Sequence, residues 1–110
     1  MSAAAAVPLD ASLRALADGN RRAILSVVRD EPRAVGEIAT EVEMSQQAVS
    51  HHLRVLKGAG LVSEKREGTR HLFAVQSDGF EVVQQFLEDF WPKRLTALKA
   101  AAEKAAKRRG

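Results

Sequence analysis

The stretch that decides the fold is Ser45-Gln46-Gln47-Ala48-Val49-Ser50-His51-His52-Leu53-Arg54-Val55-Leu56-Lys57-Gly58-Ala59-Gly60-Leu61-Val62. Val49, Leu53 and Leu56 follow the i, i+4, i+7 spacing of one apolar helix face. Ser45 is a favourable N-cap, and the two glycines that follow Lys57 are typical of a helix end. The stretch therefore predicts a helix of about twelve residues that ends in a turn.

The face opposite this apolar stripe carries Gln47, Ser50, His51 and Arg54 and contains no acidic residue. Glutamine can bond adenine and arginine can bond guanine in the DNA major groove. The free amides at the start of the helix suit a phosphate group. We therefore expect DNA contacts from seven residues of this segment: Ser45, Gln46, Gln47, Ser50, His51, Arg54 and Lys57.

After the glycines, the pattern changes to that of two short strands, over Leu61 to Lys65 and Arg70 to Val75. Glu67-Gly68-Thr69 joins them, which predicts a β-hairpin with a glycine at its bend. Basic side chains gather near its tip and are expected to contact phosphates or a minor groove. They are Lys65, Arg66 and Arg70.

Three shorter helices are expected before the central stretch. Leu9, Leu13 and Leu16 predict the first, with Asp10 as its N-cap and an end near Asp18-Gly19-Asn20. The second covers 21–29, before Pro32, and the third covers 35–42. Helices followed by a hairpin outline a mainly α winged helix-turn-helix fold, with a tight turn at Glu43-Met44.

From Ser77 onward the helical period returns, and Pro92 should kink this last helix or start a new segment near Trp91. One face of it is apolar: Phe80, Val83, Leu87, Phe90, Leu95, Leu98, Ala102 and Ala105. Together with Phe86 and Trp91, this is more apolar surface than a small core can hide, so a second copy would cover it. We divide the chain into a frayed leader (1–8), one domain (9–103) and a basic tail (104–110) that is expected to fray.

The composition excludes several classes of function. The chain of 110 residues has no cysteine, which rules out disulfides, thiolate metal sites and cysteine nucleophiles. It has no apolar run long enough to span a membrane and no signal peptide, so a cytoplasmic protein is expected. The formal net charge of +3 permits a polyanionic partner without establishing one.

Three segments closely resemble the ArsR/SmtB family of winged-helix repressors. They are the central stretch, the segment Leu16-Ala17-Asp18-Gly19-Asn20-Arg21-Arg22-Ala23-Ile24-Leu25 and the hairpin bend Arg66-Glu67-Gly68-Thr69-Arg70. The segment around Trp91 is similar to the terminal helix of members that lack metal sites. The resemblance implies a homodimer, formed by the first and last helices, that binds an imperfect palindrome in duplex DNA and represses transcription, often of its own operon. The expected dimer residues are Leu9, Leu13, Leu16, Phe86, Leu87, Phe90, Trp91, Leu95 and Leu98.

The chain departs from the metal sensors of this family. Where some carry a cysteine pair in the third helix, it reads Glu37-Ile38-Ala39-Thr40-Glu41-Val42, and its last helix has no histidine. His51 and His52 are adjacent on a helix and point about 100° apart, so they cannot ligate one ion together. We therefore expect no metal site and no cofactor, and the signal that would release the protein from DNA is open.

Other interpretations compete with DNA binding. His52 is expected to pack or cap. His71 is expected to lie on the strand surface, with a DNA contact as the less favoured alternative. Glu88 and Asp89 diverge around a helix and form no acid–base pair, so no enzyme is predicted. A winged-helix protein-interaction module is the main rival, because a fold alone does not settle function. A small-molecule sensor with a cavity between the terminal helices is compatible with DNA binding.

Overall fold

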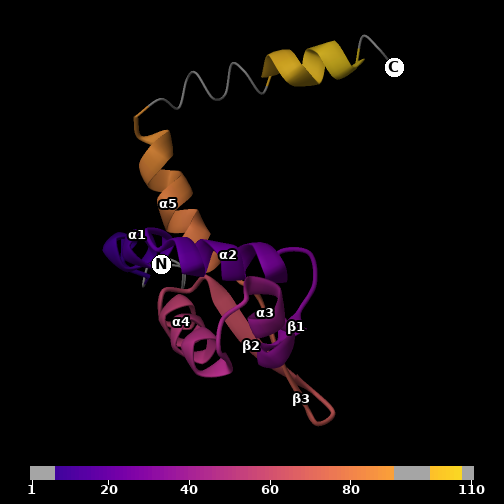
Figure 1. Ribbon diagram of the computed structural model, residues 1–110. Coiled ribbons are helices and arrows are strands. Elements are labelled where there is room, and N and C mark those ends of the chain that lie inside the picture. Colours follow the sequence, from indigo (N-terminus) through magenta and orange to yellow (C-terminus); the bar gives the residue numbers. More distant parts are fainter. Residues whose placement is uncertain (1–6, 91–99, 108–110) are drawn as a thin grey trace.

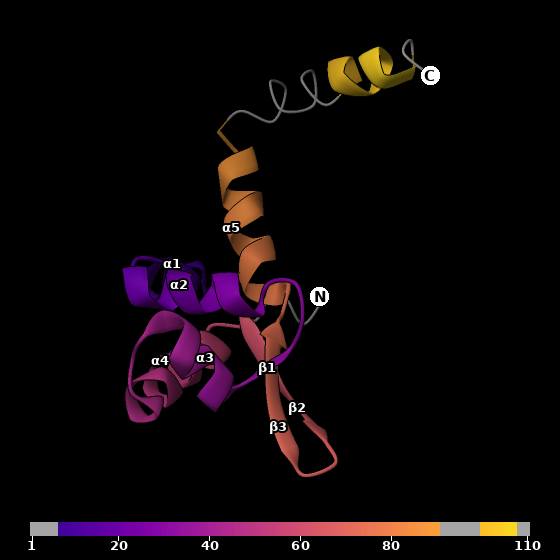
Figure 2. The same ribbon diagram turned by 45° about the vertical axis from the view of Figure 1, so that its right-hand side comes forward.

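The computed structural model describes residues 7–90 and 100–107. A helical body carries a β-hairpin at one end, and α5 extends from the other end (Figures 1 and 2). Residues 100–107 form a further helical segment, which includes the first four residues of the predicted basic tail. The labelled elements are α1 (Leu9–Leu16), α2 (Gly19–Val28), β1 (Arg33–Ala34), α3 (Val35–Val42), α4 (Gln46–Gly58), β2 (Val62–Glu67), β3 (Arg70–Val75) and α5 (Asp78–Glu88).

The core forms where the apolar stripes of α2, α3 and α4 meet. Ile24, Ile38 and Leu56 are fully buried there, together with Leu61 after the glycine turn. Burial of such a side chain contributes about 1.5–3 kcal/mol. The turn between α3 and α4 lies at Glu43, which adopts the left-handed conformation (φ 57°) and ends α3. This arrangement confirms the predicted helix-turn-helix.

The first two helices differ from expectation at their ends. Pro8, not Asp10, occupies the N-cap position of α1, and Asp10 lies in the first turn. Asp18 does not end α1; its side chain accepts hydrogen bonds from the amides of Asn20 and Arg21 and so caps α2. Proline's fixed φ suits a helix start, and an aspartate is a strong N-cap wherever the chain turns into the next helix.

The hairpin belongs to a three-stranded antiparallel sheet with the order β1-β3-β2. β1, in which Ala34 pairs with Leu72 of β3, was not predicted from the sequence. The first hairpin strand also begins at Val62, not Leu61, and continues to Glu67. The bend is therefore shorter than predicted, and Gly68 in it has a positive φ of 64°.

The start of α5 packs against the end of α4, and two glycines, Gly60 and Gly79, allow this close contact. Gly60 has a positive φ of 71°, and its carbonyl accepts a 2.8 Å hydrogen bond from the amide of Gly79 in the first turn of α5. α1 reaches the same point, since the buried Ser12 hydroxyl donates to the Ala59 carbonyl at 3.4 Å. A Cβ at Gly60 would lie 3.3 Å from Val7 Cγ2, so the end of the predicted leader packs on the domain.

The predicted long helix ends at Glu88, and Asp89 is its C-cap. The proposed kink at Pro92, with Trp91, Leu95 and Leu98, lies outside the described residues. None of the helices in 7–90 and 100–107 combines the length and apolarity that crossing a membrane requires.

Candidate nucleic-acid interface

α4 presents two different faces. Val49, Leu53 and Leu56 are buried in the core and fix the rotation of the helix. This rotation leaves Gln47, His51, Arg54 and Lys57 exposed and Ser50 half-buried. The helix has no acidic residue. Its outer face therefore presents amide, hydroxyl, imidazole and guanidinium groups, which are the donors and acceptors that can bond base edges.

The start of α4 is anchored to α3. Ser45 Oγ accepts a 3.1 Å hydrogen bond from the Ala48 amide, as expected for an N-cap. The Gln46 side chain lies over Gly36 of α3, because a Cβ built there would be 3.4 Å from Gln46 Nε2. Both residues were predicted to contact DNA, and in the structure each also makes a local contact that fixes the helix start.

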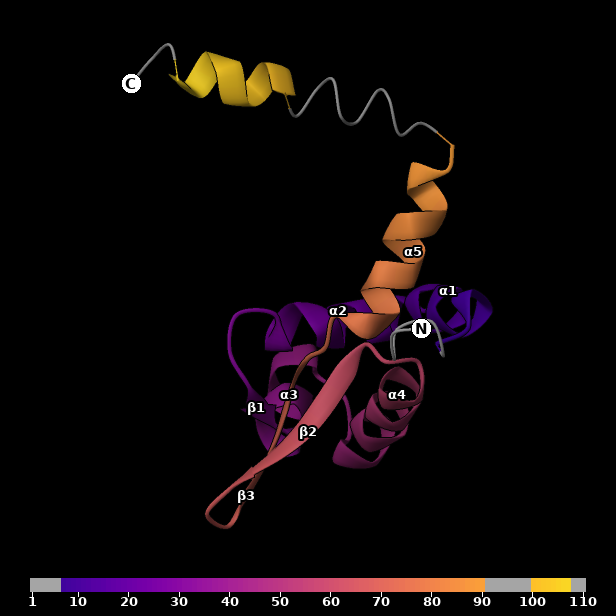
Figure 3. The ribbon, with the colours of Figure 1, turned by 180° about the vertical axis from the view of Figure 1, so that it is seen from behind.

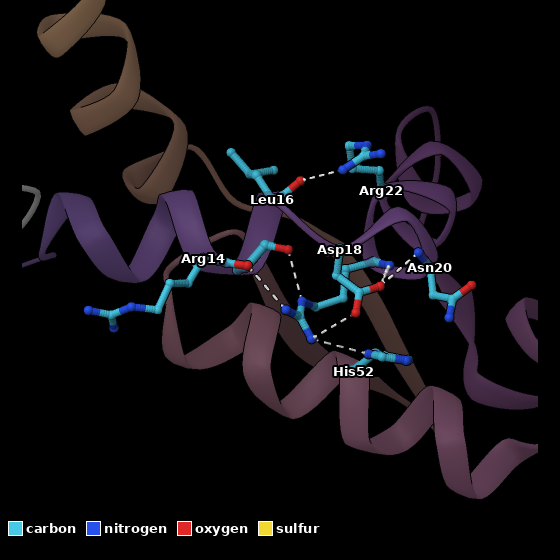
Figure 4. A network of polar contacts seen from close by, with 8 residues as sticks. Arg14, Leu16, Asp18, Asn20, Arg22 and His52 are labelled. Carbon is cyan, nitrogen blue, oxygen red and sulfur yellow. Dashed lines mark hydrogen bonds and ion pairs between the residues drawn. The ribbon is translucent and has the colours of Figure 1, made fainter.

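A network of arginines joins α1, α2 and α4 (Figure 4). Arg21 donates through Nε to the Ala15 carbonyl at 2.8 Å and through Nη2 to the Arg14 carbonyl at 3.1 Å. Its Nη1 lies 3.4 Å from Nδ1 of His52 on α4. These bonds satisfy carbonyls at the end of α1 and fix α4 against the first two helices.

The network confirms the packing role that was expected for His52. The connecting role of Arg21 was not predicted from the sequence. Neither was that of Arg22, which donates to the Leu16 carbonyl at 2.9 Å (Figure 4). The only signal in the sequence is that two arginines come three and four residues after the Asp18 cap.

Glu64 of β2 links the hairpin to α4. Its Oε1 accepts a 3.1 Å hydrogen bond from Lys57 Nζ, and its Oε2 pairs with Nε2 of His71 on β3. The hydrogen bonds from Lys57 and His71 lower the pKa of Glu64 from its ordinary value. Lys57, predicted to contact DNA, is thus held by a carboxylate of the hairpin.

Arg70 links the hairpin to α3. Its Nη2 lies 2.8 Å from Glu37 Oε1, which also accepts a 2.9 Å hydrogen bond from the Ala34 amide. The Ala34 amide, followed by the Arg70 guanidinium, lowers the pKa of Glu37. Arg70 is therefore paired in the structure, whereas Lys65 and Arg66 are exposed and form no ion pair within 7–90 and 100–107.

The predicted DNA contacts thus share one end of the molecule. α4 and the hairpin lie on the side away from the far end of α5 (Figures 1 and 3). Among the described residues, no group of three or more His, Asp or Glu side chains is placed to hold a metal ion.

A second exposed surface lies on α1, on α5 and on the turn that directly follows α5. Leu13, Phe86, Leu87 and Phe90 have exposed fractions of 40%, 38%, 41% and 65%, and the rings of Phe86 and Phe90 meet edge to face at 4.9 Å. Leu9 and Leu16 are half-buried. α5 projects past the helical body, so the described part of the chain leaves its outer half uncovered (Figure 2).

Comparison with known proteins identifies the family to which this chain belongs. A sequence model of bacterial regulatory proteins of the arsR family matches residues 18–64, from the Asp18 cap through α4 to Glu64. The HTH-type transcriptional regulator Rv2034 of Mycobacterium tuberculosis (strain ATCC 25618 / H37Rv) is 42% identical over 87 residues, which cover 79% of this chain and 81% of that protein. The chain belongs to the ArsR family. It is a DNA-binding transcriptional regulator and not an enzyme.

Solved structures agree with this ArsR-family assignment. An ArsR-like transcriptional regulator from Rhodococcus sp. RHA1 has a TM-score of 0.72 and 27% identity, over 94% of this chain and 98% of that one. Mb0332 from Mycobacterium bovis, a homodimeric winged helix-turn-helix DNA-binding domain, has a TM-score of 0.60 and 32% identity, over 86% of this chain and 78% of that one. The predicted winged helix-turn-helix fold of this ArsR-family chain is confirmed.

Proposed function

We propose that this chain is a homodimeric repressor that binds an imperfect palindrome in a promoter, which can be its own. Each α4 enters the major groove of one half-site, and the centres of the half-sites lie about one helical turn, ~34–36 Å, apart. Repression needs only that the bound dimer occupies promoter DNA that the polymerase must reach. The protein is expected to act in the cytoplasm.

The observation that carries this proposal is the acid-free outer face of α4, whose exposed side chains include Gln47, His51 and Arg54. A carboxylate on that face would repel phosphates and could only accept hydrogen bonds from base amino groups, whereas amide and guanidinium groups suit purine edges. An interface for a protein partner would instead carry aromatic and other apolar side chains at its centre. The rival protein-interaction function is therefore less well supported.

The homodimer is proposed from the apolar surface on α1 and α5. Leu13, Phe86, Leu87 and Phe90 are large apolar side chains exposed in the single chain, and burying them against a second copy removes that area from water. A homodimer is reported for Mb0332, which has the same fold at 32% identity. Trp91, Leu95 and Leu98 extend the predicted interface beyond the described residues.

Two substitutions test the assignment of α4 and the hairpin. Gln47→Ala should cost about 1–3 kcal/mol of binding and relax specificity at one base position. Arg66→Ala should weaken binding to all sequences alike and reduce the salt dependence, because it removes a phosphate contact. Fluorescence anisotropy with matched and mutated duplexes at several salt concentrations measures both effects.

Arg29→Ala is the matched control, since Arg29 is the exposed C-cap residue of α2, pairs with Asp30 and lies outside α4 and the hairpin. It should leave the affinity and the salt dependence unchanged. If Gln47→Ala and Arg66→Ala also left both unchanged, the assigned DNA-binding surface would be wrong.

A further inference from the structure

Between α4 and the hairpin lies a hollow of about 270 Å³. Ser50 and Arg54 line it from α4, and Glu64, His71 and Phe73 line it from the hairpin. If α4 lies in a major groove and the hairpin tip reaches the adjacent minor groove, the phosphate strand that separates the two grooves must pass over this hollow. The hollow is therefore a place where the charge of each lining side chain affects DNA binding.

Glu64 is the acidic group in this hollow. Its hydrogen bonds to Lys57 and His71 lower its pKa, so it remains a carboxylate at neutral pH. A carboxylate repels a nearby phosphate strand, unless neighbouring cations offset its charge. Lys57 offsets it permanently, whereas His71 does so only when the imidazole is protonated.

The groups around His71 are mostly cationic. Arg54 lines the hollow from α4, Glu64 of β2 is bonded both to His71 and to Lys57 of α4, and Arg66 is the cross-strand partner of His71. Arg70, the preceding residue on β3, is paired with Glu37 of α3. The Phe73 ring stacks obliquely on the imidazole with centroids 5.2 Å apart. The negative charge of a phosphate strand over this surface would offset the charge of these cations. Their repulsion of a protonated His71 ring would then be weaker.

The orientation of the ring allows protonation without rearrangement. Nε2 points at the Glu64 carboxylate and donates to it, so the second proton is taken up at Nδ1 while this bond is kept. Histidine side chains ordinarily gain this proton between about pH 5 and 8. The exposed fraction of 45% leaves the His71 side chain accessible to solvent and to a ligand.

We infer that His71 is a further DNA-contacting residue, and that binding of a duplex is accompanied by uptake of a proton on its imidazole ring. The inference rests on the proposed function, because it requires that α4 and the hairpin bind a duplex together. DNA affinity should then fall as pH rises, by at most tenfold per pH unit for one proton.

The test is fluorescence anisotropy with a specific duplex at about pH 6 and about pH 8 and constant ionic strength. The wild type should bind about three- to tenfold more tightly at the lower pH. His71→Gln keeps a neutral amide beside Glu64 and should bring the affinity ratio close to one. Glu64→Gln removes the carboxylate and should tighten binding at about pH 8.

The chain has three histidines, so the same substitution at each of them shows which residue takes up the proton. His51→Gln and His52→Gln should keep most of the wild-type affinity ratio. Calorimetric titration in two buffers of different ionisation enthalpy should detect proton uptake in the wild type and its loss in His71→Gln.

Three outcomes distinguish a failure of this inference from a failure of the proposed function. Tight duplex binding with the same pH ratio in His71→Gln as in the wild type would overturn the inference alone, as would weaker binding of Glu64→Gln at about pH 8. Failure of the wild type to bind any duplex specifically at either pH would overturn the proposed function as well.

Discussion

Gly79 leaves no space for a side chain where α5 begins. A Cβ there would lie 2.3 Å from the Ala59 carbonyl oxygen and 2.8 Å from Leu61 Cδ2. The first of these is a backbone atom at the end of α4, which cannot move without shifting the helix. Because the Gly79 amide also donates to the Gly60 carbonyl, the contact between α4 and α5 depends on this glycine.

Gly79→Ala should therefore lower the free energy of unfolding by about 1–3 kcal/mol, the usual cost of forcing extra volume into a packed site. Urea unfolding measures the change. Gly58→Ala is the control, since a Cβ at Gly58 would meet nothing within 4 Å, and alanine favours a helix by up to about 1 kcal/mol. Equal stability of the Gly79→Ala chain and the wild type would contradict the tight packing described here.

At the level of elements, three carboxylates connect neighbouring segments. Partial desolvation raises the pKa of Asp18, but the amides of Arg21 and Asn20 outweigh it, so this pKa lies below its ordinary value of 3.8. Glu37 joins α3 to the hairpin and Glu64 joins α4 to it, and both have a pKa below 4.5 for the reasons given above. In each case the folded chain favours the charged form.

This predicts a loss of stability in acid. A pKa that is lower in the folded state means that the unfolded chain binds more protons near these values, so the stabilisation is present above about pH 4.5 and is lost as pH falls through the folded values. Thermal unfolding between pH 7 and pH 3 measures it. The triple variant Asp18→Asn, Glu37→Gln, Glu64→Gln should show a flatter pH dependence, and an unchanged profile would refute the role of these carboxylates.

The elements also differ in how far the sequence predicts them. α4 was predictable because Ser45, the stripe at Val49, Leu53 and Leu56, and the glycines after it all indicate the same helix. β1 was not, because two residues carry no periodicity and pair only through distant β3. The pairing of Lys57, Glu64 and His71 was equally hidden, since it depends on how the hairpin folds back beside α4. Such contacts follow from tertiary structure and leave no local pattern.

At the level of the whole molecule, two surfaces are separated. α4 and the hairpin lie at one end, and the outer half of α5 lies at the other (Figures 1 and 2). Phe86 near the end of α5 and Phe90 just after it are exposed. A second copy that covered α5 would leave both α4 helices free. Two half-sites could then be bound at once, which ties DNA affinity to dimer formation.

Phe90→Glu should shift the protein towards the monomer and weaken operator binding, because it places a charge on the apolar surface. Phe90 is 65% exposed in the single chain, so the fold should survive. Analytical ultracentrifugation measures the oligomeric state. Gln85→Glu adds the same charge to an exposed position on the opposite side of α5 and should leave the dimer intact. A Phe90→Glu protein that remained dimeric would place the interface elsewhere.

The most direct test of the proposed repressor is selection of bound duplexes from a randomised DNA pool, followed by anisotropy titration of the selected sequence at several salt concentrations. The proposal predicts a palindromic consensus with half-sites about one helical turn apart, affinity in the nanomolar range and a steep salt dependence. Weak binding without a consensus would contradict it, and would direct the search to protein partners or to a missing co-ligand.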